Sequence, residues 1–167
     1  MAETAIMKSW ANRSQFGNIF TLVAVGDREG VKEAVGKENG ALKATEEEAG
    51  AGPLHWAVKH DREELVRILV DLGADMEAVD ADSETPLLYA CREGRAGMVG
   101  LLADQCGADL AAVGLGGQTG LHRVAARGRG AAMETLIRLG AGLDARDAGG
   151  STPLHLACAR AGGRRKE

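Results

Sequence analysis

The chain has 167 residues, of which 45% are apolar and 3% aromatic, and its formal net charge is −4. This length and apolar content predict one globular domain with a core of Leu, Val, Ile and Ala, and they exclude a disordered chain. The negative charge argues against a nucleic-acid-binding surface, and no apolar run reaches the roughly 18 residues that span a bilayer.

The first 16 residues precede the repeated part of the chain and predict an N-terminal extension. They carry Glu3, Lys8 and Arg13 and no apolar segment, so we expect no secretory signal there. Three cysteines, an odd number, argue against a disulfide framework. We therefore expect an intracellular, cytoplasmic setting, with an organelle or the nucleus as alternatives.

Residues 17–49 predict a first, degenerate unit of two helices joined by a turn at Gly26-Asp27. The unit lacks the Thr-Pro that opens later ones, as a terminal capping repeat does. An acidic run, Glu46 to Glu48, follows and predicts a solvated turn tip, with an acidic contact for a basic partner as the alternative. The apolar residues at helical spacing are Ile19, Phe20, Leu22, Val23, Val31, Ala34 and Val35.

Residues 50–82 are the fullest copy of this unit. Pro53 suits the first turn of a helix, which is expected to end in a turn at residues 59–62. A second helix is expected from Glu63 to Asp71, where apolar residues follow helical spacing. Gly73 supplies the left-handed residue that ends it, and an acidic, extended stretch then leads into the next unit.

Residues 83–116 and 117–149 repeat the unit with the same order of helices and turns. The third copy holds one residue more than the second between its paired leucines and its closing glycine, which predicts a longer second helix or a bulged turn near Gln105-Cys106. The next turn carries Gly114, Gly116 and Gly117 and lacks the aspartate of equivalent turns. Each interior glycine weakens local order by about 0.5–1 kcal/mol, so we expect this junction to be the softest.

A partial fifth unit, residues 150–161, stops after its first helix, and residues 162–167 form a basic tail. The apolar face of that helix, with Leu154, Leu156 and Ala157, would be poorly covered. Three interpretations stay open: a short natural cap, a unit that a partner completes, or a truncated chain. The basic residues of the tail predict a solvated chain end. A nuclear localisation signal and a contact with an anionic partner are the alternatives.

One short phrase opens four of these units at a period of about 33 residues, which is the mark of a solenoid built from stacked repeats. Its copies are Gly52-Pro53-Leu54-His55, Thr85-Pro86-Leu87-Leu88, Thr119-Gly120-Leu121-His122 and Thr152-Pro153-Leu154-His155.

Together with Gly73-Ala74-Asp75 and Gly107-Ala108-Asp109, which recur in phase, this pattern resembles the ankyrin repeat over about residues 17–161. The resemblance implies an all-α fold: one domain that is a solenoid of stacked helix-turn-helix units with short β-hairpin loops. The sequence departs from the family pattern where Gly52 replaces Thr, Gly120 replaces Pro and Leu88 replaces His.

Three histidines, His55, His122 and His155, occupy one repeat position. Stacked helices lie about 8–10 Å apart, so successive copies do not converge on one metal ion. The resemblance implies a structural role for these histidines, bonding across to a neighbouring turn. Cys91 and Cys158 share another repeat position and are interpreted as small core residues. We expect no catalytic, cofactor-binding or metal-binding residues.

Positions that vary among the copies while the scaffold positions stay similar are the candidates for partner binding. Resemblance places them near the concave face that ankyrin proteins use for partners, and Trp, Tyr and Arg are enriched in interface hot spots. For Trp56, packing between neighbouring first helices is the alternative. The candidates are Trp56, Lys59, His60, Asp82, Glu84, Tyr89, Arg92, Glu93, Arg123 and Arg127.

The leading functional interpretation is a non-enzymatic protein–protein interaction module, acting as a scaffold or accessory subunit of a multi-subunit complex. The alternative is a small free-standing ankyrin-type regulator or inhibitor of an enzyme. Protein partners are expected, with no small-molecule substrate, no cofactor and no membrane span. Association with nucleic acid is a remote alternative, which requires Arg92, Arg127 and Arg160 to align as a stripe.

Overall fold

The computed structural model describes residues 17–37, 40–46 and 49–163, which form two compact units divided between Asp75 and Met76. Unit 1 contains α2 (Gly17–Val25), α3 (Arg28–Lys37), the 3-10 turn η1 (Ala41–Lys43), α4 (Pro53–Lys59) and α5 (Glu63–Asp71). Unit 2 contains α6 (Pro86–Glu93), α7 (Ala96–Gly100), η2 (Leu101–Gln105), η3 (Leu115–Gly117), α8 (Gly120–Arg127), α9 (Gly130–Arg138) and α10 (Pro153–Gly163). The predicted all-α class is confirmed, whereas the division into one domain and five repeats stays a prediction.

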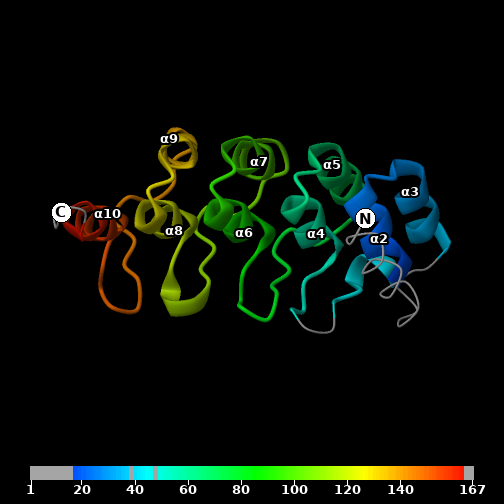
Figure 1. Ribbon diagram of the computed structural model, residues 1–167, viewed down its shortest axis with the longest axis horizontal. Coiled ribbons are helices and arrows are strands. Elements are labelled where there is room, and N and C mark those ends of the chain that lie inside the picture. Colours follow the sequence, from blue (N-terminus) through cyan, green and yellow to red (C-terminus); the bar gives the residue numbers. More distant parts are fainter. Residues whose placement is uncertain (1–16, 38–39, 47–48, 164–167) are drawn as a thin grey trace. The chain divides into compact units, whose positions relative to one another are not determined.

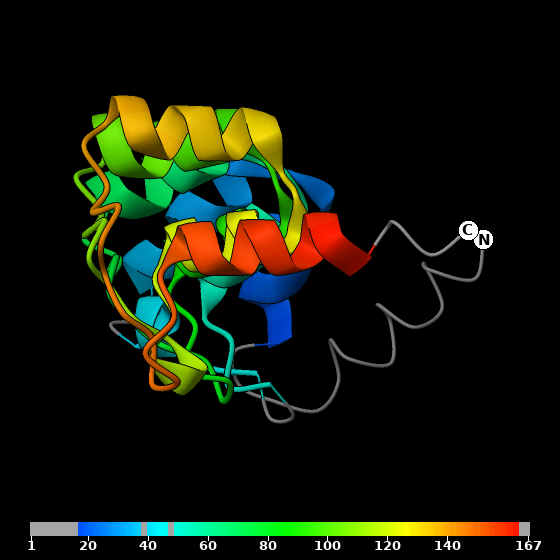
Figure 2. The same cartoon turned by 90° about the vertical axis from the view of Figure 1, so that its left-hand side faces the viewer.

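Each unit is built from antiparallel helix pairs that pack on their neighbours. In unit 1, α2 packs against α3 and α4, and α4 packs against α5. In unit 2, α6, α8 and α10 lie side by side in one layer, while α7 and α9 lie in a second layer (Figures 1 and 2). We call the helices of the α4, α6, α8 and α10 series the first helices, and those of the α5, α7 and α9 series the second helices.

The first helices begin where the repeated phrase predicts. The hydroxyl oxygen of Thr85 accepts a hydrogen bond from the Leu88 amide at 3.3 Å. At Gly52, which has no side chain to cap α4, Nδ1 of His55 accepts a hydrogen bond from the Gly52 amide at 3.3 Å. The histidine of the phrase therefore satisfies an amide at the helix start from inside the first turn.

The first and last turn tips of unit 2 are held by an aspartate at their first position. Oδ1 of Asp80 accepts hydrogen bonds from the amides of Asp82 and Glu84, each at 2.9 Å. Oδ1 of Asp147 does the same for Gly149 and Ser151. The Ser151 amide is the main cause that holds the pKa of Asp147 below its usual value. Among the described residues, the tips are tight turns whose one isolated β-bridge joins Val113 and Thr119.

The extra residue of the third copy is absorbed by a π-helical turn, η2, directly after α7. The Cys106 amide bonds to the carbonyl of Leu101 at 3.1 Å, which is the i to i−5 pattern of a π-helix. In the neighbouring copies the closing bond spans five residues, from Ala74 to Leu69 and from Ala141 to Leu136, whereas here it spans six, from Ala108 to Leu102. The predicted bulge is therefore confirmed.

Gly120 stands where other copies have proline, and Cys91 lies against it. A Cβ at Gly120 would lie 2.8 Å from Sγ of Cys91, which is closer than carbon and sulfur pack. Cys91 is fully buried, and this burial raises the pKa of its thiol to about 12, so the thiol stays protonated at neutral pH. Its small side chain is thus a core residue that shapes the neighbouring helix start.

Replacing Gly120 with Ala is expected to destabilise unit 2 by about 1–3 kcal/mol, because the new methyl group overpacks the Cys91 site. Equilibrium urea unfolding followed by circular dichroism measures this loss. In a Cys91→Ala background the same substitution should cost much less, since the clashing sulfur is gone. Equal losses in both backgrounds would contradict the packing argument.

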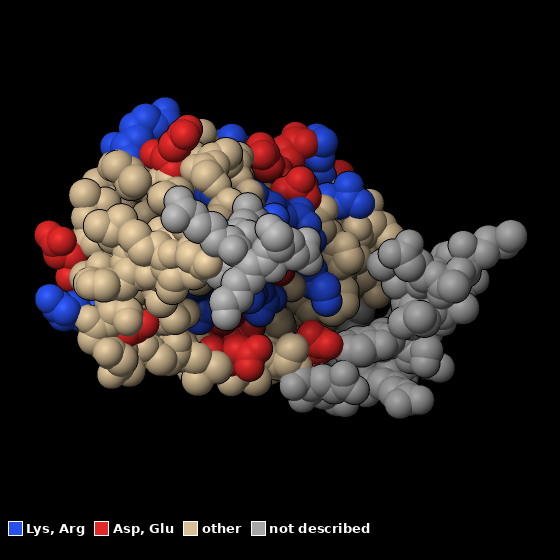
Figure 3. Space-filling model, turned by 60° about the vertical axis from the view of Figure 1, so that its left-hand side comes forward, with Lys and Arg blue, Asp and Glu red and all other residues tan. Residues whose placement is uncertain are grey.

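The C-terminal end of unit 2 is apolar and partly uncovered. The helix α10 packs against α8 and reaches Gly163, two residues beyond the predicted end of the fifth unit. Leu154 is 70% exposed, and Ile137 and Leu143 are also exposed. Figure 3 shows a broad area without charged side chains on this end.

Several expectations concern residues outside the described part of the chain: the extension over residues 1–16, the acidic residues Glu47 and Glu48, and the basic residues 164–166. Within the described part, no helix combines the length and the apolar character needed to cross a bilayer.

Candidate protein-binding surface

An aromatic cluster surrounds Trp56, which lies on α4 in unit 1. The ring of Trp56 is 5.5 Å from the ring of Phe20 and 5.3 Å from that of His60, measured between centroids. Nζ of Lys59 lies 5.0 Å from the Trp56 centroid, in a cation–π position. The indole N–H donates to the carboxylate of Glu46 at 3.4 Å. The structure therefore brings together Trp56, Lys59 and His60, with Lys59 exposed and Trp56 half-buried.

Unit 2 carries an equivalent pair one repeat further along. Tyr89 and Arg92 hold the same positions in α6 as Trp56 and Lys59 in α4, and Cζ of Arg92 lies 4.1 Å from the Tyr89 ring centroid. The guanidinium of Arg92 also contacts Glu84 at 2.8 Å and Glu93 at 3.2 Å. Burial alone would lower the pKa of Arg92, but the charges of Glu84, Tyr89 and Glu93 raise it above its ordinary value. Arg92 thus stays a fixed positive charge beside an aromatic ring.

Glu84 and Arg123 form a buried ion pair, which corrects the expectation that they are surface positions. The side chain of Glu84 is 3% exposed and that of Arg123 is 10% exposed, and Nη1 of Arg123 contacts Oε1 of Glu84. With Arg92 on its other oxygen, the Glu84 carboxylate joins two successive repeats. These groups bind each other within the chain, so neither Glu84 nor Arg123 belongs to the candidate protein-binding surface.

Gly114 makes room for this pair. A Cβ at this position would collide with Nη2 of Arg123 and lie 3.2 Å from Leu88. An aspartate, which starts the equivalent turns, would not fit at position 114 while Arg123 occupies this space. Sequence reasoning missed this role of Gly114, because the signal consists of two departures from the repeat pattern that are nine residues apart and must be considered together.

The remaining predicted residues are exposed. Asp82 lies at the tip of its turn, where its amide donates to Asp80. Arg127 ends α8, and its Nη1 donates to the carbonyl of Arg92 at 3.3 Å. The structure thus places Arg92, Glu93 and Arg127 at the ends of the first helices of unit 2, with Tyr89 in the middle of α6 and Asp82 on the turn tip.

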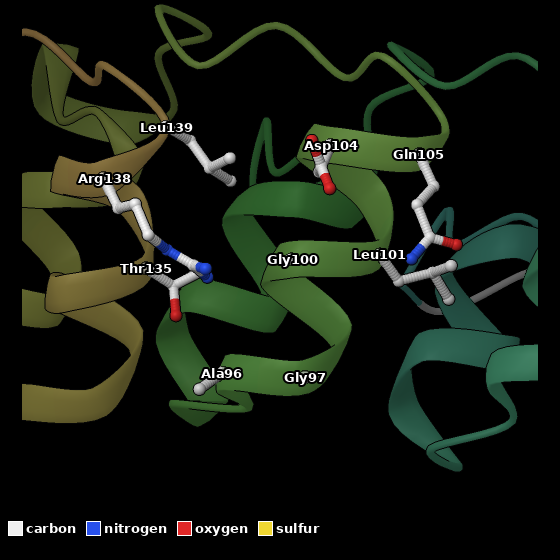
Figure 4. A pocket seen from close by; sticks show the side chains of 9 residues that line it. All are labelled: Ala96, Gly97, Gly100, Leu101, Asp104, Gln105, Thr135, Arg138 and Leu139. Carbon is white, nitrogen blue, oxygen red and sulfur yellow. The ribbon is translucent and has the colours of Figure 1, made fainter.

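A groove of about 340 Å³ lies between α7, η2 and α9, on the second-helix side of unit 2 (Figure 4). The small residues Ala96, Gly97 and Gly100 leave it open, and the side chains of Asp104 and Arg138 border it from opposite sides. A groove with one carboxylate and one guanidinium suits a polar side chain of a partner. It lies in the layer opposite the Tyr89–Arg92 pair.

The predicted structural role of the repeated histidine is confirmed at His122. Its Nδ1 accepts from the Thr119 amide at 3.3 Å, so its Nε2 carries the proton and donates to the carbonyl of Ser151 at 3.0 Å. His122 is fully buried, whereas His155 makes the same local bonds to Thr152 but is exposed. Over the described ranges, no three His, Cys, Asp or Glu side chains come together as a metal site would require.

Comparison with known proteins identifies the repeat. The sequence model of a family described as ankyrin repeats (3 copies) matches residues 19–114. The chain is 36% identical over 94 residues to NF-kappa-B inhibitor alpha of Homo sapiens, which covers 53% of this chain and 30% of that protein. It is 38% identical over 93 residues to the B-cell lymphoma 3 protein homolog of Mus musculus, which covers 55% of this chain and 20% of that protein.

A third relative is Protein glp-1 of Caenorhabditis elegans, at 35% identity over 57 residues, which is 34% of this chain and 4% of that protein. The chain therefore spans less than a third of the length of these curated relatives.

Proposed function

The chain belongs to the ankyrin repeat family, and from this premise we propose that it is a non-enzymatic protein-binding module that contacts its partner through its first helices and turn tips. One observation carries the proposal: the same aromatic–cation pair recurs at equivalent positions, as Trp56–Lys59 in unit 1 and Tyr89–Arg92 in unit 2. The scaffold around these pairs is buried, whereas the pairs themselves remain partly exposed.

Aromatic rings beside fixed cations have the chemistry of interface hot spots. Such rings add apolar contact area at a low entropic cost, and the neighbouring cations add directional hydrogen bonds to a partner. The proposed contact residues are exposed or half-buried: Trp56, Lys59 and His60 in unit 1, and Asp82, Tyr89, Arg92, Glu93 and Arg127 in unit 2.

The finer role that we propose is that of a regulator which binds a partner reversibly. It is supported by the name of a relative, NF-kappa-B inhibitor alpha, which describes that protein as an inhibitor. The sequence alone favours a scaffold or accessory subunit of a larger assembly. The two roles differ in whether the chain exchanges between a free and a bound form. A regulator is found both free, at the mass of a single chain, and in a complex, whereas a fixed subunit is found only in the complex. Size-exclusion chromatography of native extract separates them.

The binding surface is tested by cross-linking the native chain, identifying its partner by mass spectrometry, and measuring affinity with the purified partner. The double variant Trp56→Ala, Tyr89→Ala is expected to weaken binding by about 2 kcal/mol or more, which is roughly thirtyfold. Arg92 is left intact because its truncation would disturb the buried Glu84.

A matched control carries Ile137→Ala and Leu143→Ala, which also remove exposed apolar side chains but lie on α9 and the turn after it. This control should bind as the wild type does. Equal weakening in both variants, with unchanged unfolding midpoints, would place the binding site elsewhere.

A further inference from the structure

Four arginines lie at the ends of the first helices of unit 2. Arg92, Arg127 and Arg160 come from the last turns of α6, α8 and α10, and Arg129 directly precedes α9. We call these four residues the arginine ridge. Because the first helices lie side by side, their ends fall along one edge of the unit (Figure 1).

Direct contacts fix the ridge residues beside one another. Arg127 donates to the carbonyl of Arg92 at 3.3 Å. The side chain of Arg129 lies against Gly94, where any Cβ would collide with its Cγ and Cδ. The side chain of Arg160 lies against Gly128 in the same manner.

Two left-handed glycines therefore support the ridge. Gly94 and Gly128 have φ of +74° and +65°, values that disfavour a side chain, and the absence of one lets each arginine lie flat on the backbone of the preceding repeat. The sequence carries a sign of this arrangement. In two successive repeats an arginine lies in the last turn of the first helix, at Arg92 and Arg127, and a second arginine directly follows the left-handed glycine, at Arg95 and Arg129.

The charge of the ridge is only partly neutralised. Arg92 pairs with Glu84 and Glu93, but Arg127, Arg129 and Arg160 form no ion pair with any carboxylate of the described residues. Between residues 76 and 163 there are ten carboxylate side chains and eight arginines, so half of the arginines of this segment lie on the ridge. Figure 3 shows Lys and Arg side chains gathered near the middle of the face that it presents. Clustered like charges raise the local potential and attract the opposite charge.

We propose that the arginine ridge binds an acidic segment of the partner protein. This inference rests on the proposed protein-binding function and specifies the chemistry of the partner. Guanidinium groups bind carboxylates through paired hydrogen bonds, and three of them are free of carboxylates in the described chain. The ring of Tyr89, 4.1 Å from Arg92, offers an apolar contact next to the acidic residues.

A short acidic segment fits the charge distribution better than a nucleic acid does. The turn tips of unit 2 carry Asp80, Asp82 and Asp147, and the whole chain has a net charge of −4. A long polyanion would be repelled by these carboxylates, since its phosphates extend beyond the ridge. A segment of a few acidic residues can contact the ridge alone.

The test uses the full chain and a fluorescein-labelled hexaglutamate peptide that ends in tryptophan, with fluorescence anisotropy measured at low ionic strength. The wild type should bind this peptide and not the matched hexaglutamine peptide. The variant Arg127→Glu, Arg160→Glu should bind it about tenfold more weakly or worse. The control Lys43→Glu, Arg146→Glu changes the net charge equally but involves no ridge residue, and it should bind as the wild type does.

Equal weakening in both variants would overturn the inference, because net charge would then explain binding. So would tighter binding of a single-stranded oligothymidine than of the peptide. If the wild type captures its native partner but binds no acidic peptide, the inference fails while the proposed function stands. If the wild type has no protein partner, the proposed function itself fails. Circular dichroism and unfolding midpoints check that both variants are folded.

Discussion

Replacing Glu84 with Gln is expected to destabilise unit 2 by roughly 3–5 kcal/mol, as for other buried ion pairs that lose one partner. The Glu84 side chain is 3% exposed and forms ion pairs with both Arg92 and Arg123. Without its charge, the guanidinium of Arg123 stays buried with no counterion. Its Nε is already buried without a hydrogen-bond partner among the described residues, so no second contact offsets the loss.

Equilibrium urea unfolding measures this effect, and Glu93→Gln is the matched control. Glu93 also pairs with Arg92 but is 41% exposed at its side chain, so its substitution should cost about 1 kcal/mol or less. The double variant Glu84→Gln, Arg123→Met should recover much of the stability, because it removes the stranded charge. A loss below about 1 kcal/mol for Glu84→Gln would show that the pair is solvated and not buried.

Replacing His122 with Ala is expected to lower the free energy of unfolding by roughly 2–4 kcal/mol. The substitution leaves a cavity and removes the hydrogen bonds of His122 to Thr119 and to Ser151. His122 is fully buried, holds the start of α8 and donates to Ser151, which lies 29 residues further along the chain. His155 repeats the local bonds at the start of α10, but it is exposed.

His155→Ala is therefore the internal comparison, and it should cost about 1 kcal/mol, the value of a lost helix cap. Urea unfolding gives both losses, and hydrogen exchange locates them. Faster amide exchange in the turn at residues 147–151 should follow from His122→Ala but not from His155→Ala. Equal losses would mean that the bond to Ser151 contributes little.

The helices could be predicted from the sequence, because each ankyrin repeat has the same apolar spacing, caps and closing glycines. The predicted second helix, Glu63 to Asp71, has the same bounds as α5. Gly73 ends that segment with φ of +90°. Local rules of this kind are strong when several of them agree within one unit.

The candidate site was harder to predict, since variation among repeats has two physical causes. One cause is contact with a partner, and the other is a compensating pair inside the stack. Glu84 and Arg123 belong to the second kind, and they are 39 residues apart in the sequence. Nothing local to either residue marks it as buried, because the burial arises only where successive repeats stack and Gly114 leaves space. The sequence therefore predicted which positions depart from the scaffold but not which of them face solvent.

The π-helical turn bears on how repeat length can change. One extra residue in an α-helix rotates everything after it by about 100° around the helix axis. Here the rotation is confined to Leu101–Gln105, and Gly107 still leaves the helix with φ of +77°, in the same left-handed region as Gly73 and Gly140. The later repeats consequently keep their phase. An insertion of one residue at this point does not shift the helices of the repeats that follow. A repeat is therefore defined by its turns rather than by its number of residues.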